Sequence, residues 1–172
     1  IYGEGEETFR EFLQTLEGGR GDFSNIRGLV YRDGDVIIQN TPRSNIKELD
    51  KIPFPYRNGL SGLENKIIYY ETSRGCPFNC QYCLSSTIEG VRYFSLDRVL
   101  DEIDFFIDRK VPQVKLVDRT FNCPPKRAKT IIEHIIKRGG STNFHFEVAA
   151  HLIDQDMLEL FKRAPSGLFQ LE

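Results

Sequence analysis

The sequence predicts an α/β fold in which a parallel sheet follows a smaller α/β piece, and three observations lead to this prediction. From residue 67 onward, short apolar strands alternate with amphipathic helices, as in parallel βαβ units. A segment rich in proline and glycine, residues 40–66, predicts a linker. The 172 residues suffice for one domain with a real core, or for a domain and a fragment. We therefore divide the chain into residues 1–39, the linker 40–66 and residues 67–172.

The first 39 residues predict one helix and one β-hairpin. Apolar side chains recur at helical spacing before Gly18 and Gly19, which would end the helix. These apolar positions are Phe9, Phe12, Leu13 and Leu16. Residues 26–39 consist of two β-branched runs around Asp33-Gly34, a strong turn signal for a hairpin.

Residues 67–172 predict strands and helices in alternation. The strands are expected at residues 67–73, 113–118, 143–149 and 168–172. The helices are expected at residues 96–109, 125–138 and 155–164, after the start signals Ser95, Pro124-Pro125 and Asp154. Three and a half such units build half of a barrel or an open sheet, and in these folds chemistry gathers at the carboxyl ends of the strands.

Bulk composition argues against several classes of function. A net charge of −2, with basic and acidic residues mixed throughout, predicts no electrostatic affinity for nucleic acids or anionic membranes. No apolar run reaches membrane-spanning length, and no basic-then-apolar leader opens the chain. The cysteines are clustered rather than spread as in a secreted disulfide framework, so the cytoplasm is the expected compartment.

Three of the four cysteines, Cys76, Cys80 and Cys83, stand within eight residues directly after the first strand of the second region. Thiolates this close together are expected to converge on one centre. Zinc usually takes two ligand pairs and a ferredoxin-type cluster takes four cysteines, and neither pattern is present. The favoured interpretation is a 4Fe–4S cluster held at three irons, with the fourth open to a small chelating molecule. A zinc-binding interaction module and an electron-transfer iron–sulfur protein stay open as alternatives.

The pattern Cys76-x3-Cys80-x2-Cys83, with the aromatic Tyr82 just before the last cysteine, resembles the radical S-adenosylmethionine enzymes over about residues 67 to 172. The resemblance implies the first half of a partial (β/α)6 TIM-like barrel, a 4Fe–4S cluster, and S-adenosylmethionine as its fourth ligand. It also implies reductive cleavage of this cosubstrate to a 5′-deoxyadenosyl radical, with electrons from a flavodoxin- or ferredoxin-type donor. The expected reaction is methylation or another C–H modification of a small molecule or peptide.

The resemblance also implies a polar motif on the second strand, where this sequence departs from the family's common Gly-Gly-Glu. Asp118 stands at the carboxyl end of that strand, where its carboxylate would accept hydrogen bonds from the ammonium group of S-adenosylmethionine. Together with Phe121 and Asn122, Asp118 is similar to the variant found in cobalamin-linked members. The alternative for Asp118 and Asn122 is a capping role in a turn.

Two glutamates are further candidates for binding the cosubstrate. On the third strand, Phe144, Phe146 and Val148 alternate with His145, Glu147 and Ala149. If the apolar face packs on helices, Glu147 points to the barrel interior, where a carboxylate is costly unless partnered. An ion pair with Lys115 is the alternative. Glu172 matches the position on the family's fourth strand where a glutamate often contacts the ribose or amino-acid part of the cosubstrate.

The N-terminal stretch "GEGEETF" is a weak dinucleotide signal, because Thr8 holds the third glycine position. It resembles the last strand and helix of the cobalamin-binding domain that precedes the barrel in one class of the family. The cobalamin-ligating Asp-x-His-x-x-Gly pattern is absent. Cobalamin is therefore expected only as a cofactor of a full-length parent.

Both ends of the chain lead us to expect a piece of a longer protein. The first residue is Ile1 rather than Met, and residues 168–172 read as the start of a strand. A barrel stopped there would leave an unpaired strand edge that recruits another chain. We therefore expect the piece to self-associate and to lack catalysis on its own.

Overall fold

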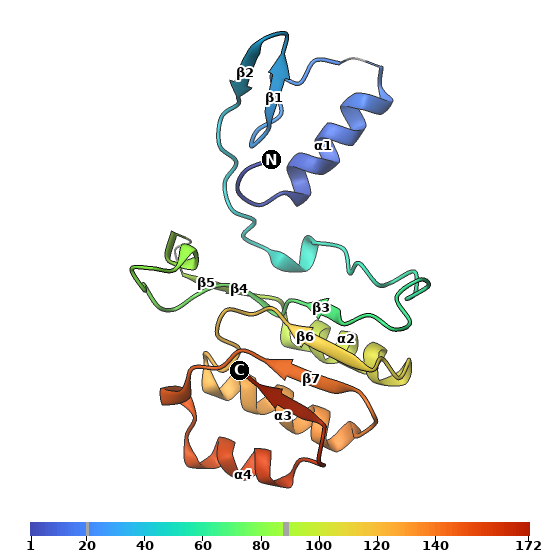
Figure 1. Cartoon of the computed structure of the whole chain (residues 1–172), viewed down its shortest axis with the longest axis vertical. Helices are drawn as coiled ribbons and strands as arrows, with labels where there is room; N and C mark the ends of the chain where they lie inside the picture. The colour runs from blue at the N-terminus through green and yellow to red at the C-terminus, as the bar shows by residue number, and fades with distance from the viewer. Residues whose placement is uncertain (20, 88–89) are drawn as a thin grey trace. The chain divides into compact units, whose positions relative to one another are not determined.

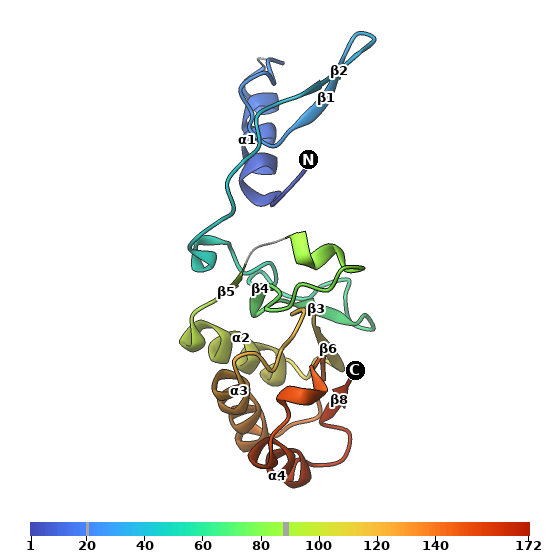
Figure 2. The ribbon, with the colours of Figure 1, turned by 90° about the vertical axis from the view of Figure 1, so that its left-hand side faces the viewer.

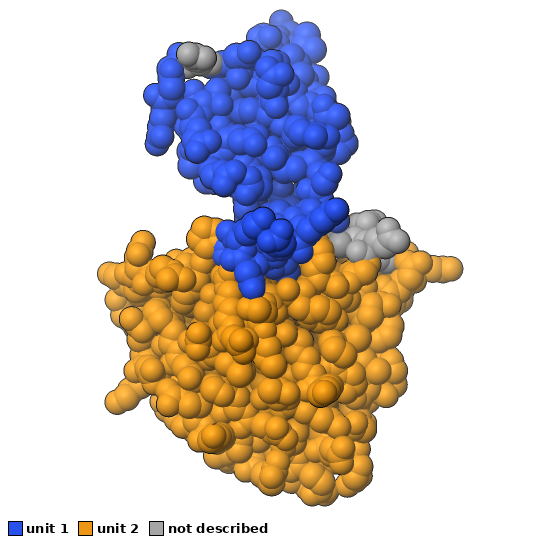
Figure 3. All heavy atoms as spheres, turned by 180° about the vertical axis from the view of Figure 1, so that it is seen from behind, with its two compact units in different colours: residues 1–52 blue, residues 53–172 orange. Residues whose placement is uncertain are grey.

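The computed structural model describes residues 1–19, 21–87 and 90–172, and the chain divides into two compact units, residues 1–52 and 53–172 (Figure 3). The boundary falls inside the predicted linker 40–66. The second part of that segment is not free of the core. Phe54 is 7% exposed, and its ring lies 5.1 Å from that of Phe105 and 5.6 Å from that of Phe106.

The first unit contains a helix and a hairpin in the order that the sequence predicts (Figure 1). Helix α1 (Glu6–Glu17) is followed by strand β1 (Val30–Asp33), which pairs antiparallel with β2 (Val36–Gln39). Gly34 lies in the two-residue turn with a φ of +56°, a backbone conformation that glycine adopts without strain.

The second unit is built on a four-stranded parallel sheet in the order β3-β6-β7-β8. These strands are β3 (Ile68–Tyr70), β6 (Gln113–Leu116), β7 (Asn143–Phe146) and β8 (Phe169–Leu171). The predicted parallel βαβ arrangement is confirmed. Closure of the sheet into a barrel stays a prediction.

Three helices connect the strands and lie along one face of the sheet (Figure 2). They are α2 (Leu96–Asp108), α3 (Pro125–Arg138) and α4 (Gln155–Arg163), each within a residue of its predicted bounds. Short 3₁₀ turns occur at Leu49–Lys51, Leu84–Thr87 and Ala150–Leu152. In the described part of the chain, no helix is both long enough and apolar enough to cross a membrane.

The two faces of the sheet differ in chemistry, because successive side chains of a strand point to opposite sides. Toward the helices, Val114, Leu116, Phe144 and Phe146 are fully buried. They pack in a core with apolar residues of the helices, among them Val99, Ile103, Phe106, Ile131, Ile132 and Ile135. The other face carries polar side chains, which lead to the cavity described below.

The predicted strand 67–73 is broken after Tyr70, and a second strand, β4 (Ser73–Gly75), pairs antiparallel with β5 (Val91–Tyr93). The cause is Asp118, which is fully buried beyond the end of β6. The backbone N–H of Thr72 donates to Asp118 Oδ1 at 3.1 Å and its hydroxyl does so at 2.9 Å. The Ser73 hydroxyl donates to the same oxygen.

Burial raises the pKa of the Asp118 carboxyl to about 6, against the opposing effect of its hydrogen bonds from Ser73 and Thr72. Between the ordinary carboxyl pKa of 3.8 and about 6, the folded chain holds a proton that the unfolded chain has released. The free energy of unfolding therefore falls as the pH rises through this window.

We predict that the stability of the wild type relative to Asp118→Asn, which does not titrate, decreases by up to about 3 kcal/mol between pH 4 and pH 7. Urea denaturation of both chains with reduced thiols at four pH values measures the difference. A difference that is flat or increases with pH would contradict the assignment. Val99→Ala, which changes no titratable group, is the control, and its stability relative to the wild type should show no such trend.

Candidate functional site

A cavity of about 320 Å³ opens at the carboxyl ends of the parallel strands in the second unit. It is lined by one residue of the cysteine loop and by the segments that follow β6, β7 and β8: Phe78, Arg119, Thr120, Glu147, Val148, Ala149 and Glu172. This is the edge of the sheet where the sequence places the chemistry of such folds. The cavity thus brings together the cysteine loop and two of the predicted cosubstrate residues.

The cysteine loop, residues 76–83, follows β4 directly. None of Cys76, Cys80 and Cys83 forms a disulfide, and all three are partly exposed. The Cys76 sulfur lies 3.6 Å from the hydroxyl oxygen of Thr120, which lines the cavity. Within residues 1–19, 21–87 and 90–172, no three His, Cys, Asp or Glu side chains are gathered as a metal site. Convergence of the three thiols therefore stays a prediction.

The donor set of the loop nevertheless fits an iron–sulfur cluster with one open iron. Such clusters are held by cysteine thiolates, and three reduced cysteines stand on one short loop beside a cavity. The fourth cysteine, Cys123, is also free, and burial raises the pKa of its thiol. A thiol with a raised pKa is a poorer metal ligand, because the ligand is the thiolate.

Tyr82 does not lie in the cavity. Its side chain is 93% exposed at the outer part of the cysteine loop, and that of Leu84 is 87% exposed. The structure therefore gives no contact between the predicted aromatic residue and the cavity-lining residues.

Asp118 and Asn122 are both fully buried, so neither presents its side chain to the cavity. The Asp118 carboxylate accepts hydrogen bonds from Thr72 and Ser73, and its predicted contact with the cosubstrate stays a prediction. The Asn122 amide donates to the Ala149 carbonyl at 2.9 Å and accepts from the Ala149 N–H at 2.8 Å. Asn122 thereby holds a wall of the cavity from behind.

Glu147 and Glu172 do line the cavity, and both contact Lys115. The Lys115 ammonium lies 3.5 Å from Glu147 and donates a hydrogen bond to Glu172 at 3.0 Å. The bond with Glu172 raises the pKa of Lys115, and Lys115 lowers the pKa of Glu172. The alternative ion pair of Glu147 with Lys115 is therefore present, and its contact with the cosubstrate stays a prediction.

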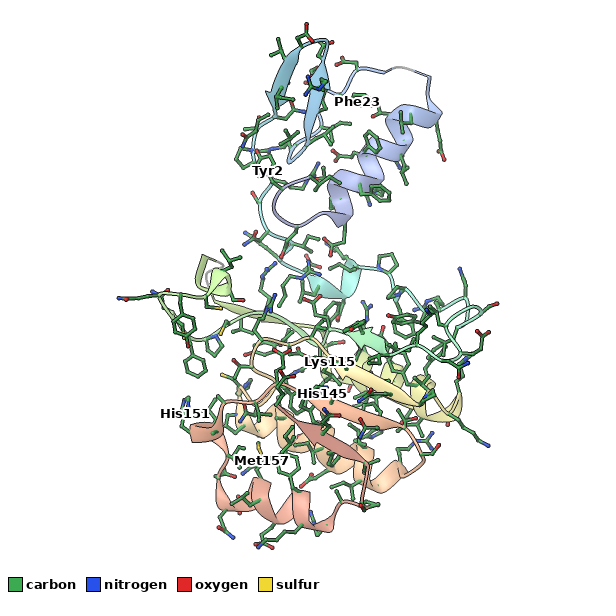
Figure 4. All side chains as sticks on the ribbon, in the orientation of Figure 1. Tyr2, Phe23, Lys115, His145, His151 and Met157 are labelled. Carbon is green, nitrogen blue, oxygen red and sulfur yellow. The ribbon has the colours of Figure 1, made fainter. Side chains whose placement is uncertain are left out.

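His145 extends this charged group across the sheet. It pairs in register with Lys115 of the neighbouring strand, and Figure 4 labels both side chains. Its ring nitrogen Nε2 lies 3.1 Å from a carboxylate oxygen of Glu172, and the residue is 7% exposed. Lys115, Glu147 and Glu172 carry a formal net charge of −1 with His145 neutral. The Arg119 guanidinium, which also lines the cavity, offsets this remaining charge.

Sequence reasoning missed Phe78, Arg119 and Thr120 as lining residues of the cavity. Arg119 and Thr120 directly follow Asp118, so their place after the carboxyl end of a parallel strand was the available signal. Phe78 gave no such signal, because a phenylalanine in a loop is equally consistent with a core contact. Its ring lies 5.2 Å from that of His151.

Known proteins similar to this chain include two curated methyltransferases. The chain is 34% identical over 149 residues to the uncharacterized methyltransferase PH0819 of Pyrococcus horikoshii, covering 81% of this chain and 32% of that protein. It is 30% identical over 136 residues to the cobalamin-dependent radical SAM methyltransferase TokK of Streptomyces tokunonensis, covering 73% and 20%. The chain thus spans a third or less of the length of these relatives.

Among solved structures, the fold is similar to that of TsrM from Kitasatospora setae, a radical S-adenosylmethionine methyltransferase with cobalamin and a [4Fe-4S] cluster bound. The TM-score is 0.70 at 15% identity, over 95% of this chain and 35% of that one. The family model described as the Radical SAM superfamily matches residues 70–171, which is more than half of the chain and includes the cysteine loop and most of the cavity lining. The chain therefore belongs to the radical SAM superfamily.

Proposed function

We propose that the whole protein is a cobalamin-dependent radical S-adenosylmethionine methyltransferase, and that this chain supplies its cysteine loop and part of its cosubstrate cavity. The observation that carries the proposal is the position of Cys76, Cys80 and Cys83 beside a cavity at the carboxyl ends of a parallel sheet. Methylation is supported by the similarity to the methyltransferases PH0819 and TokK, and cobalamin by the similarity to TokK, which is cobalamin-dependent. Family membership favours this function over a zinc-binding module or an electron-transfer protein.

Membership of the family implies a 4Fe–4S cluster and S-adenosylmethionine. When bound, they supply one-electron cleavage of the sulfonium to a 5′-deoxyadenosyl radical, the chemistry on which methylation or another C–H modification would depend. The residues of this chain would bind the cluster, orient the cosubstrate and exclude water from the cavity. Cys76, Cys80 and Cys83 would hold three irons as thiolates.

The charged residues of the cavity would orient the amino-acid end of the cosubstrate. Glu147 and Glu172 offer carboxylate oxygens to an ammonium group, while Lys115 offsets one of the two negative charges. Arg119 lines the same cavity and offers a guanidinium to a carboxylate. A cavity lined by both carboxylates and a guanidinium suits a zwitterionic ligand.

The partners of the protein belong to the same proposal. The reaction would need an electron donor of the flavodoxin or ferredoxin type and a small-molecule or peptide substrate. Reduced thiols that serve as cluster ligands are consistent with a cytoplasmic location. Asp118 and Asn122 would act in the architecture of the site, whereas Glu147 and Glu172 would touch the cosubstrate.

We predict that anaerobic reconstitution of the full-length protein loads about four iron atoms on this cysteine loop. Replacement of Cys76, Cys80 or Cys83 by Ala should each abolish this iron, since an open-iron cluster depends on three thiolates. Iron and sulfide analysis with the visible spectrum measures the result. Cys123→Ala is the matched control and should keep its iron. Stoichiometric zinc that depends on Cys123 would refute the proposal and favour a binding module.

Glu147→Gln should weaken binding of S-adenosylmethionine by roughly ten- to a hundred-fold, because a charge-assisted hydrogen bond becomes a neutral one. Iron content should not change. Equilibrium binding to the reconstituted full-length protein measures the effect. Glu133→Gln, at an exposed glutamate on α3, should bind like the wild type. Wild-type affinity in Glu147→Gln would mean that Glu147 only pairs with Lys115 and does not bind S-adenosylmethionine.

A further inference from the structure

One short segment after β6, residues 118–122, contacts both the start of the cysteine loop and the wall of the cavity; we call it the β6 turn. Its first residue, Asp118, accepts hydrogen bonds from Thr72 and Ser73. Two residues later, the hydroxyl of Thr120 lies 3.6 Å from the Cys76 sulfur. The far end of the β6 turn is bonded to the segment after β7, through the Phe121 N–H and the Asn122 side chain. The β6 turn therefore links three neighbouring strands at the site.

Burial of the Asp118 carboxylate lowers the stability of the fold unless its hydrogen bonds compensate for the lost hydration. Asp118 is 0% exposed, and a buried charge costs free energy unless it is well bound. The donors that stabilise Asp118 all come from two adjacent residues, Thr72 and Ser73, rather than from scattered parts of the fold. The carboxylate thus fixes one specific point of the chain.

The position of Thr72 and Ser73 determines where the cysteine loop begins. Ser73 is the first residue of β4, and Cys76 follows the last. This strand pairs in register with β5. The two segments approach so closely that a Cβ atom at Gly75 would lie 2.1 Å from the carbonyl oxygen of Gly90, the residue before β5. On the other side, the Phe94 N–H donates to the Thr72 carbonyl at 3.1 Å. The chain has little room to shift between Thr72 and Cys76.

The Arg127 side chain also binds the backbone at Thr72. The Arg127 guanidinium, on α3, donates to the Phe94 carbonyl at 2.9 Å and to the Thr72 carbonyl at 3.4 Å. Asp118 therefore holds the N–H side of Thr72, while Arg127 and Phe94 hold its carbonyl side. Both sets of bonds lie outside the cavity lining.

We propose that Asp118 is a positioning residue for the iron–sulfur cluster: it anchors Thr72 and Ser73 so that Cys76 is presented beside Thr120. This rests on the proposed function, because it assumes that the cysteine loop holds a cluster. It assigns Asp118 to the cluster loop instead of to the cosubstrate. Asp118 acts through its hydrogen bonds with Thr72 and Ser73 and does not line the cavity.

The test uses the reconstituted full-length protein and its variants Asp118→Asn, Asp118→Ala and Ser73→Ala. Cluster loss to an iron chelator is followed by visible absorption. We expect Asp118→Asn to release its cluster about tenfold faster than the wild type, since the amide replaces a charge-assisted acceptor. Asp118→Asn keeps the side-chain volume, so it gives a result even if Asp118→Ala does not fold.

Two controls separate positioning from general loss of stability. Val99→Ala opens a cavity in the core on α2 and should lower the unfolding temperature without a matching increase in cluster release. The variants Asp118→Asn and Ser73→Ala should be non-additive in release rate, because they remove the same interaction. In the apo protein, amide hydrogen exchange of residues 72–76 should increase in Asp118→Asn and stay unchanged in Val99→Ala.

The outcomes distinguish this inference from the proposed function. If the wild type binds a cluster through the three cysteines but Asp118→Asn releases it at the wild-type rate, the positioning role is wrong and the proposed function stands. If Val99→Ala releases the cluster as fast as Asp118→Asn at equal stability, the positioning role is also wrong. If the wild type binds no cluster at all, both are wrong.

Discussion

The hydrogen bonds between the buried Asp118 carboxylate and Thr72 and Ser73 are the constraint on which the site depends. They end the first parallel strand at Tyr70 and start a separate strand that leads to Cys76. If Asp118 did not accept hydrogen bonds from Thr72 and Ser73, no specific interaction would end the strand at this position. Because the carboxylate belongs to the end of the neighbouring parallel strand, the cysteine loop is tied to the edge of the sheet where the cavity opens.

The contrast between the two sheet faces completes the site. Val114, Leu116, Phe144 and Phe146 are fully buried toward the helices, so the intervening positions point the other way. Those positions include Lys115 and His145, which are paired in register, and Glu147 follows at the end of the strand. On this face Lys115 and Glu147 are partly exposed, so their charged groups can contact a ligand. The same alternation that builds the core thus supplies the polar groups of the cavity.

The helices and the cysteine loop were predictable because their signals are local. Apolar spacing and start residues located α2, α3 and α4 to within a residue, and three cysteines within eight residues marked the metal chemistry. The role of Asp118 was not predictable, since its donors lie 45 and 46 residues earlier in the chain. Asp118 is fully buried like Val114 and Leu116 of the strand that it follows, whereas its charge suggested a position open to a ligand. Phe54 was assigned to a linker because its flanking prolines suggested an unpacked segment.

The central claim is that the cysteine loop and the adjoining cavity form one site for a cluster and S-adenosylmethionine. Its most direct test is the electron paramagnetic resonance spectrum of the reduced, reconstituted full-length protein before and after addition of S-adenosylmethionine. An open iron that accepts the cosubstrate changes the spectrum of the cluster, and we predict this change in the wild type and its loss when Cys80 is replaced by Ala. A cluster spectrum that S-adenosylmethionine leaves unaltered would contradict the claim.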